Sequence, residues 1–139
     1  MRFYILLVAL VWLSQTPAWA QDDLCSNGRL KGVYGLHTTG AVINVGTLAA
    51  VGRFVFDGNG NLTGTLFVRV NANVNKLTIT GTYSVAADCT VSDTWYLSNG
   101  AVSTHESVIV NNGLEFFIVN TSAEASVISG VGKKQFTED

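Results

Sequence analysis

Two histidines, His37 and His105, are the first candidates for acid–base chemistry, because the unperturbed pKa of histidine lies near neutral pH. His105 shares a strand face with Ser103 and Ser107, since residues two apart on a strand point the same way. A histidine beside a serine is one fragment of a hydrolase site. The sequence contains no Gly-x-Ser-x-Gly elbow and offers no evident third group to orient the imidazole, and Glu106 points to the opposite face. The pattern therefore favours surface histidines and predicts no catalytic residue.

A second group of side chains has chemistry suited to holding a small ligand. Arg53 lies within a strand pattern, and inside a barrel its guanidinium would offer paired donors to a carboxylate. Facing outward it would be a solubilising charge, which is the favoured placement, and Glu115 has the same ambiguity. Aromatic rings would line the entrance of a pocket, although in small β-barrels they more often form core. The candidate ligand-binding residues are Arg53, Phe67, Tyr83, Trp95, Glu115 and Phe117.

Asp57, Asn59 and Asn61 have the alternating spacing that opens an EF-hand calcium loop. The match then fails, because Leu62 replaces the sharp-turn glycine and Val68 replaces the bidentate glutamate. The Asp-Gly-Asn-Gly run instead supplies residues that accept positive φ at low cost, as tight hairpin turns require. The stretch predicts a hairpin, with calcium binding as the weaker alternative, and no metal or cofactor is predicted.

The scaffold for these residues is predicted to consist of strands. Runs of β-branched, aromatic and alternating residues are separated by turn formers at intervals of about a dozen residues. After Pro17 there is no proline, and no stretch shows the apolar spacing of an amphipathic helix. The predicted strands are approximately 30–39, 48–56, 61–71, 74–85, 89–97, 103–110, 114–120 and 126–136.

These strands predict a single all-β domain over residues 21–139. Short sequential turns make neighbours in sequence neighbours in space, and closure would remove two exposed sheet edges. Glycines within the strands permit the coiling that small barrels need. The sequence therefore predicts an eight-stranded antiparallel up-and-down β-barrel. The alternative is a two-sheet β-sandwich, in which the long link 40–47 would act as a Greek-key crossover.

Residues 1–20 have the composition of a signal peptide. Arg2 precedes the apolar run Ile5–Leu13, and Ala18-Trp19-Ala20 places small residues where a signal peptidase reads. We expect cleavage before Gln21 and a secreted or periplasmic product without a membrane span. An uncleaved membrane anchor is the alternative.

The two cysteines, Cys25 and Cys89, both follow this leader. An even pair in an exported chain predicts a disulfide, whereas a metal or redox pair would call for closer spacing and nearby histidines. The bridge would tie the N-terminal lead to the body of the domain.

Charge is sparse and nearly balanced. Charged residues make up 13% of the chain, the formal net charge is −2, and Lys133-Lys134 forms the sole basic pair. This composition excludes the electrostatic footprint expected for binding nucleic acid or an anionic membrane.

Three segments carry a family resemblance: 30–35, 50–65 and 81–90. They contain the motifs FxFDGxGNxxGT and GTYxVxxDCT, which are turn and strand motifs. With them the chain resembles a family of small exported bacterial proteins without an assigned function. The layout of that family is similar to small calycin-type barrels, namely lipocalins and allene-oxide cyclases. The resemblance implies export and a barrel fold, and it implies no catalytic residue.

Three functional hypotheses follow. The first is a secreted barrel that binds an apolar small ligand in its lumen, for which eight strands leave just enough space. The second is a structural or protein-interaction module of the cell surface or extracellular matrix, which would act through an exposed apolar patch or sheet edge. The third is a cofactor-free cyclase or isomerase with an inward Tyr83, Glu115 or Arg53.

Overall fold

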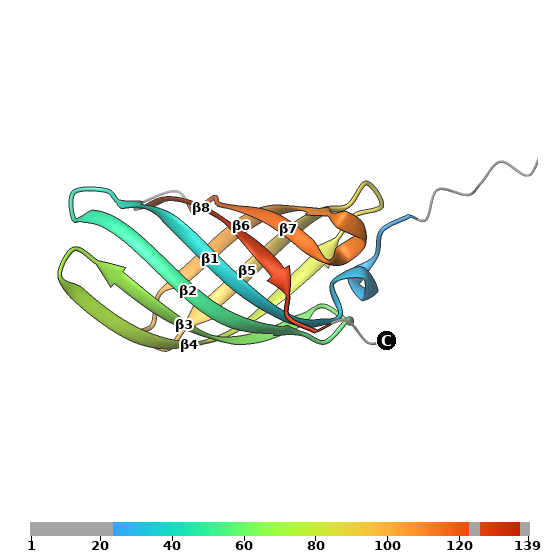
Figure 1. Ribbon diagram of the computed structural model, residues 1–139, viewed down its shortest axis with the longest axis horizontal. Helices are drawn as coiled ribbons and strands as arrows, with labels where there is room; N and C mark the ends of the chain where they lie inside the picture. Colours follow the sequence, from blue (N-terminus) through green and yellow to red (C-terminus); the bar gives the residue numbers. More distant parts are fainter. Residues whose placement is uncertain (1–23, 123–125, 137–139) are drawn as a thin grey trace, which may run out of the picture.

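The structure is a computed structural model that describes residues 24–122 and 126–136. Eight strands form one closed antiparallel barrel in which each strand pairs with the next and β8 pairs with β1 (Figure 1). The predicted up-and-down barrel is confirmed, and the sandwich alternative is wrong. The signal peptide expected at 1–20 lies outside the described residues. The strands are β1 (Gly32–Val42), β2 (Gly46–Phe56), β3 (Asn61–Val70), β4 (Asn73–Val85), β5 (Thr90–Leu97), β6 (Val102–Val110), β7 (Glu115–Asn120) and β8 (Ser126–Lys134).

The link between β1 and β2 is much shorter than predicted. β1 continues to Val42 and β2 starts at Gly46, so three residues make the connection. Val45 N donates to Val42 O at 3.0 Å, and Asn44 accepts a φ of 63°. The expected crossover at 40–47 is therefore a tight hairpin, because asparagine adopts the left-handed region at low cost.

The Asp-Gly-Asn-Gly hairpin has the predicted form. Gly58 and Gly60 take positive φ values of 84° and 106°. Asp57 Oδ1 accepts from Asn59 N at 2.6 Å and from Asn61 N at 3.0 Å, and Asp57 Oδ2 accepts from Asn61 Nδ2 at 2.7 Å. These hydrogen bonds lower the pKa of Asp57. The carboxylate thus satisfies the backbone of its own turn.

One half of the barrel is filled with aromatic and aliphatic side chains. Ring centroids of Tyr34, Phe56 and Phe116 lie 5.4 to 5.9 Å apart, in edge-on or tilted arrangements that aromatic pairs prefer. The ring of Phe116 occupies the space that a side chain at Gly132 would need. The inward residues of this half are Tyr34, Phe54, Phe56, Leu62, Tyr83, Val91, Ile109 and Phe116.

A short 3-10 helix, η1 (Asn27–Leu30), closes this half of the barrel (Figure 1). Leu30 was predicted to begin the first strand, but it lies in η1 and inserts into the core with 1% of its surface exposed. Asn27 Oδ1 accepts from Val85 N at 2.8 Å, and the predicted disulfide Cys25–Cys89 joins the lead to the end of the β4–β5 turn. We refer to this half as the closed half.

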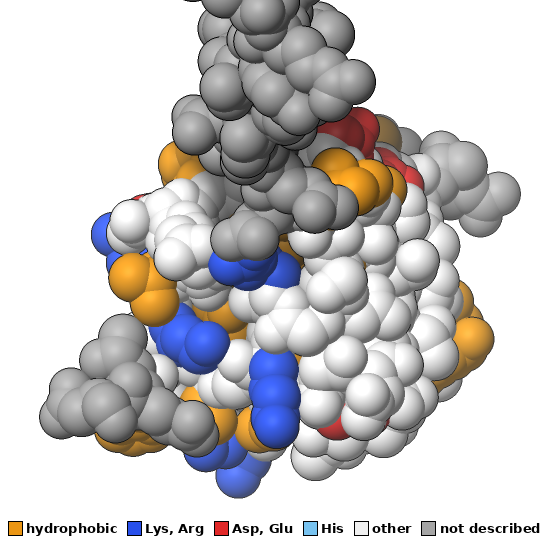
Figure 2. All heavy atoms as spheres, turned by 90° about the vertical axis from the view of Figure 1, so that its right-hand side faces the viewer, with side chains coloured by type: hydrophobic (Ala, Val, Ile, Leu, Met, Phe, Trp, Pro, Cys, Tyr) orange, Lys and Arg blue, Asp and Glu red, His pale blue; other side chains and the backbone are white. Residues whose placement is uncertain are grey.

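Lys and Arg side chains gather at the closed end (Figure 2). Arg29 lies in η1, Lys31 follows it, and the Lys134 ammonium lies 5.8 Å from the centroid of the Tyr34 ring. A second 3-10 helix, η2 (Asn111–Gly113), packs here, and its Gly113 carbonyl accepts from the buried Tyr34 hydroxyl. Burial raises the pKa of Tyr34 to about 12. No helix among residues 24–122 and 126–136 is long and apolar enough to span a bilayer.

Candidate functional site in the open half of the barrel

The other half of the barrel encloses a cavity of about 950 Å³. Its lining includes Val42, Val70 and Asn99, which lie at or beside the β1–β2, β3–β4 and β5–β6 turns. The β1–β2 and β3–β4 turns lie at the end of the barrel opposite to η1 (Figure 1). Its volume lies within the range of small-molecule binding sites. Most of its wall is aliphatic, and the wall residues include Val42, Leu48, Val68, Val70, Leu97 and Ile128. We refer to this half as the open half.

The cavity exists because inward side chains become smaller along the strands. On β2 the inward positions from the closed end to the open end are Phe56, Phe54, Gly52, Ala50 and Leu48. On β1 the small inward residues Thr38 and Gly40 follow Tyr34 and Leu36 and precede Val42. Large rings therefore fill one half of the lumen, and small residues leave the other half hollow.

A chain of polar side chains lies where the filled and hollow halves meet. Asp93 on β5 and His105 on β6 are direct cross-strand partners, and His105 pairs with Asn120 on β7. His105 Nδ1 lies 2.8 Å from Asp93 Oδ1, and His105 Nε2 lies 3.0 Å from Ser103 Oγ. Asn120 Nδ2 donates to Ser103 Oγ at 2.7 Å. We call Asp93, His105, Ser103 and Asn120 the polar chain.

The buried end of this chain is almost closed to water. Asp93 is 8% exposed and His105 is 6% exposed, whereas Ser103 is half-buried on the cavity wall. Burial raises the pKa of Asp93, and the hydrogen bond and charge of His105 oppose that rise. A carboxylate only accepts hydrogen bonds, so His105 donates from Nδ1 to ionised Asp93. In the neutral imidazole, Nε2 is then the acceptor for the Ser103 hydroxyl.

Trp95 completes this part of the wall. Its ring centroid lies 4.0 Å from that of His105, and the planes are inclined by 42°. The indole Nε1 is buried without a hydrogen-bond partner among the described residues. A buried donor without a partner costs stability, and the described residues supply no acceptor for this N–H.

Of the six candidate ligand-binding residues, Trp95 alone lines the large cavity. Tyr83 is buried in the closed half, where its hydroxyl accepts from Gly58 N at 2.9 Å and donates to Asn27 O at 3.1 Å. Tyr83 also borders a smaller hollow of about 280 Å³ that reaches Asp93 and His105.

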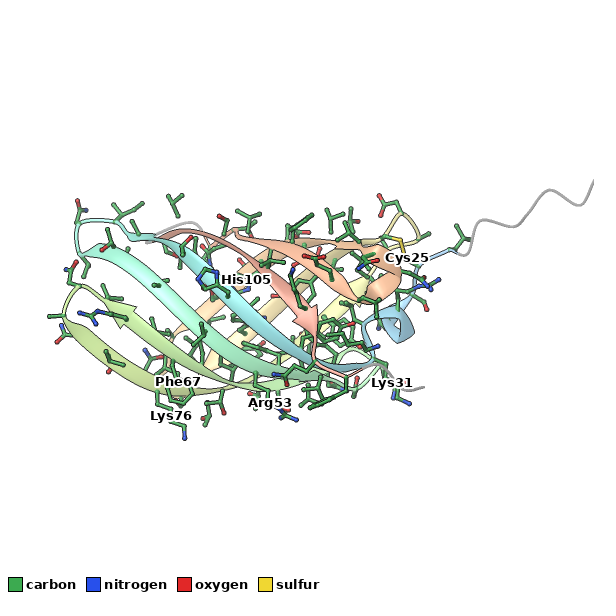
Figure 3. The ribbon with its side chains drawn as sticks, viewed as in Figure 1. Cys25, Lys31, Arg53, Phe67, Lys76 and His105 are labelled. Atoms are coloured by element: carbon green, nitrogen blue, oxygen red, sulfur yellow. A yellow bond between two sulfur atoms is a disulfide. The ribbon has the colours of Figure 1, made fainter. Side chains whose placement is uncertain are left out.

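The other four candidates lie outside the lumen. Arg53 and Phe67 project from the outer face, and the Lys76 ammonium lies 5.6 Å from the Phe67 ring centroid (Figure 3). Phe117 is 54% exposed, and half-buried Glu115 pairs with Lys133 at 3.4 Å. These four residues do not meet at one site with Trp95.

The prediction of a surface His105 is wrong, because its side chain turns into the barrel. His37 is exposed, as predicted. The sequence reasoning also missed the third group that orients His105, which is Asp93. The sequence did contain a signal for it: a hairpin centred on Asn99 places Asp93 opposite His105, and their shared parity places both on one face.

The outer face carries a row of exposed apolar side chains. Val108 pairs with Phe117 and Val51 pairs with Phe67, and exposed fractions range from 46% to 54% for these four residues. Val131 and His37 connect the two pairs across β8 and β1. We call this set the outer row.

Comparisons with known proteins agree with the fold. No protein-family model matches the chain, and no curated protein matches it. Among solved structures, a redesigned β-barrel matches with a TM-score of 0.57 and 12% sequence identity, covering 79% of this chain and 95% of that chain. At this identity the likeness shows a shared barrel fold.

Proposed function

We propose that the protein binds an apolar small molecule that carries one polar group in the open half of the barrel. The observation that supports this most strongly is the cavity of about 950 Å³, with aliphatic walls and a polar chain at one place on its wall. Sites of this kind gain affinity from buried apolar surface and gain orientation from a few polar groups.

The polar groups favour a ligand with a hydrogen-bond acceptor. Asn120 lines the cavity, and its Nδ2 donates to Ser103 Oγ at 2.7 Å. A carbonyl or ether oxygen of a ligand would accept a hydrogen bond from a donor of this kind. The hydrocarbon part of the ligand would then lie against the aliphatic wall near the open end.

Export belongs to the same proposal. The leader-like composition of residues 1–20 and the Cys25–Cys89 disulfide support a protein that acts outside the cytoplasm. The resemblance to small exported barrel proteins supports export and the barrel fold, and the carrier or sensor role rests on the cavity itself.

The test fills the cavity and measures ligand binding. Ala50 lines the cavity and is 4% exposed, whereas its neighbour Val51 projects outward and is 53% exposed. Ala50→Phe should weaken binding of an apolar fluorescent dye about tenfold or more, because the ring takes the space of the ligand. Val51→Phe is the matched control and should bind as the wild type does.

Both variants would be purified from the bacterial periplasm after expression of the full chain, and native mass spectrometry would reveal any co-purified molecule. Val70→Trp at the cavity entrance is a second filling variant for the case in which Ala50→Phe fails to fold. Equal dye affinity in the wild type and a folded filling variant, or no binding by the wild type, would contradict the proposal.

The outer row favours a second candidate function, which is association between copies of the chain. Val108 and Phe117 are exposed cross-strand partners on β6 and β7, and water solvates such an apolar pair poorly. Phe117→Ser should abolish self-association measured by sedimentation velocity, and Val74→Ser, on an exposed part of β4, is the control. A wild type that stays monomeric at all concentrations tested would exclude this candidate.

A further inference from the structure

We propose that the polar chain is an acyl-transfer site, in which Ser103 is the nucleophile, His105 is the general base and Asp93 positions the imidazole. The substrate would be an ester whose apolar chain occupies the cavity, so this inference rests on the proposed binding function. It goes beyond binding by assigning a reaction to the bound molecule.

The geometry matches the three roles. Ser103 Oγ is 3.0 Å from His105 Nε2, and Asp93 Oδ1 is 2.8 Å from the other ring nitrogen, Nδ1. Both distances lie within the reach needed for proton transfer and for orientation of the base. Arrangements of this kind occur on unrelated folds and are recognised by geometry and role, so a strand can carry the serine as well as a turn.

The residues of the polar chain differ in their exposure to the cavity, as the reaction requires. Ser103 lies on the cavity wall and is half-buried, so a bound ester can reach its oxygen. His105 and Asp93 are almost buried, which keeps water away from the hydrogen bond that orients the ring. Electrostatic interactions are stronger in such a site than in water.

An amide donor lies beside the nucleophile. Asn120 Nδ2 is 2.7 Å from Ser103 Oγ, and Ser126 Oγ donates to Asn120 Oδ1 at 3.1 Å, which fixes the orientation of the amide. Donors of this type stabilise the negative charge of a tetrahedral intermediate.

The reaction balances with water as the co-substrate. The Ser103 hydroxyl proton passes to His105 Nε2 as Oγ bonds to the ester carbonyl carbon, and the oxyanion accepts from Asn120. The bond from carbon to the alkoxy oxygen then breaks, and the alcohol leaves with the proton from His105. Water attacks the acyl group on Ser103 and gives a proton to His105. The carboxylic acid departs, and Ser103 regains its proton.

The first experiment uses an alkyl fluorophosphonate probe, which forms a stable bond to an activated serine and releases fluoride. Intact mass and peptide mapping of the wild type should show one adduct on Ser103. Ser103→Ala should show none, and Ser107→Ala is the matched control, because Ser107 lies on the same face of β6 outside the cavity wall. An unlabelled wild type, or an adduct on another residue, would overturn the proposal.

The second experiment measures hydrolysis of p-nitrophenyl esters with acyl chains of two to twelve carbons. The rate should rise with chain length, because a longer chain fills more of the cavity. Ser103→Ala should lower kcat/KM about 1000-fold, which is the scale of losing a nucleophile with its base. Ser107→Ala should retain the wild-type value, and equal rates in all three proteins would overturn the proposal.

Asp93→Asn tests the positioning role. An amide at this site can still bond His105 but can hold it in the wrong tautomer, so kcat should fall with little change in KM and the pH profile should change shape. An unchanged pH profile would assign Asp93 a purely structural role. Dye binding by the wild type separates the two proposals, because a wild type that binds the dye but hydrolyses no ester would overturn acyl transfer alone.

Discussion

Removal of the disulfide should destabilise the protein through its unfolded state. Cys25 lies before the barrel and Cys89 lies in the β4–β5 turn, so the bridge closes a loop with a sequence separation of 64 residues without joining two strands of the ladder. The chain-entropy relation gives about 4 kcal/mol for a loop of this length. For a domain of this size that loss corresponds to a decrease in Tm of about 15 °C.

The assay is urea unfolding of Cys25→Ala/Cys89→Ala beside the oxidised and the reduced wild type. The double variant and the reduced wild type should agree, because both lack the same constraint. Dye affinity of the folded variant should match the wild type, since the cavity lies at the opposite end of the barrel. A decrease in unfolding free energy of less than about 1 kcal/mol would refute the entropic reasoning.

Three further predictions concern single side chains. Burial raises the pKa of Asp93 above its ordinary value of 3.8, so the folded state holds the proton more tightly than the unfolded state. The stability that this provides is complete below pH 3.8 and is lost as pH rises through the folded-state pKa. As pH rises through that window, the unfolding free energy of the wild type should therefore decrease relative to that of Asp93→Asn. Urea unfolding of both proteins from pH 3 to pH 8 measures this change. A difference between the two unfolding free energies that does not vary with pH would contradict the prediction. Tyr34→Phe should cost about 1 to 3 kcal/mol in the same assay, because the Gly113 carbonyl loses its buried donor, and a neutral result would show that water replaces the hydroxyl. Gly132→Ala should cost about 1 to 3 kcal/mol, because the new methyl group meets the Phe116 ring, and Phe116→Leu should recover part of that loss if the clash is the cause.

Most of the barrel could be predicted from local patterns. Alternation and turn formers gave eight strands whose ends differ from the observed ends by three residues or fewer. The largest difference, at the link 40–47, arose because Asn44 and Gly46 were not recognised as the two positive-φ positions of a tight turn. Turn chemistry at single residues therefore decided between the barrel and the sandwich.

Which side a residue faces was harder to predict on strands with apolar residues on both faces. Phe116 and Phe117 are adjacent aromatic residues, and β7 alone does not determine which of them enters the core. The choice depends on β8, where Gly132 leaves room for the Phe116 ring. A residue without a side chain on one strand thus fixes the orientation of a large ring on its neighbour.

The polar chain depends on pairing register, which is a long-range property. Asp93 and His105 are twelve residues apart and meet only because the intervening hairpin is centred on Asn99. A search for motifs of neighbouring residues misses such pairs. Residues at equal distances before and after a predicted hairpin turn are cross-strand partners, and comparing them finds the pairs. In the same way, the turn at Asn112 and Gly113 brings His105 opposite Asn120 on the next strand.

The two halves of the barrel differ in what fills them. The closed half contains the aromatic cluster, η1 and the disulfide, which fix the strands and their register. The open half can then hold a cavity and the buried groups of the polar chain. Both features would destabilise a protein whose hydrophobic core lay in that half. Substitutions near Tyr34 or Phe56 should therefore affect stability before binding, whereas substitutions near Ala50 or Ser103 should affect binding or chemistry in a barrel that remains folded.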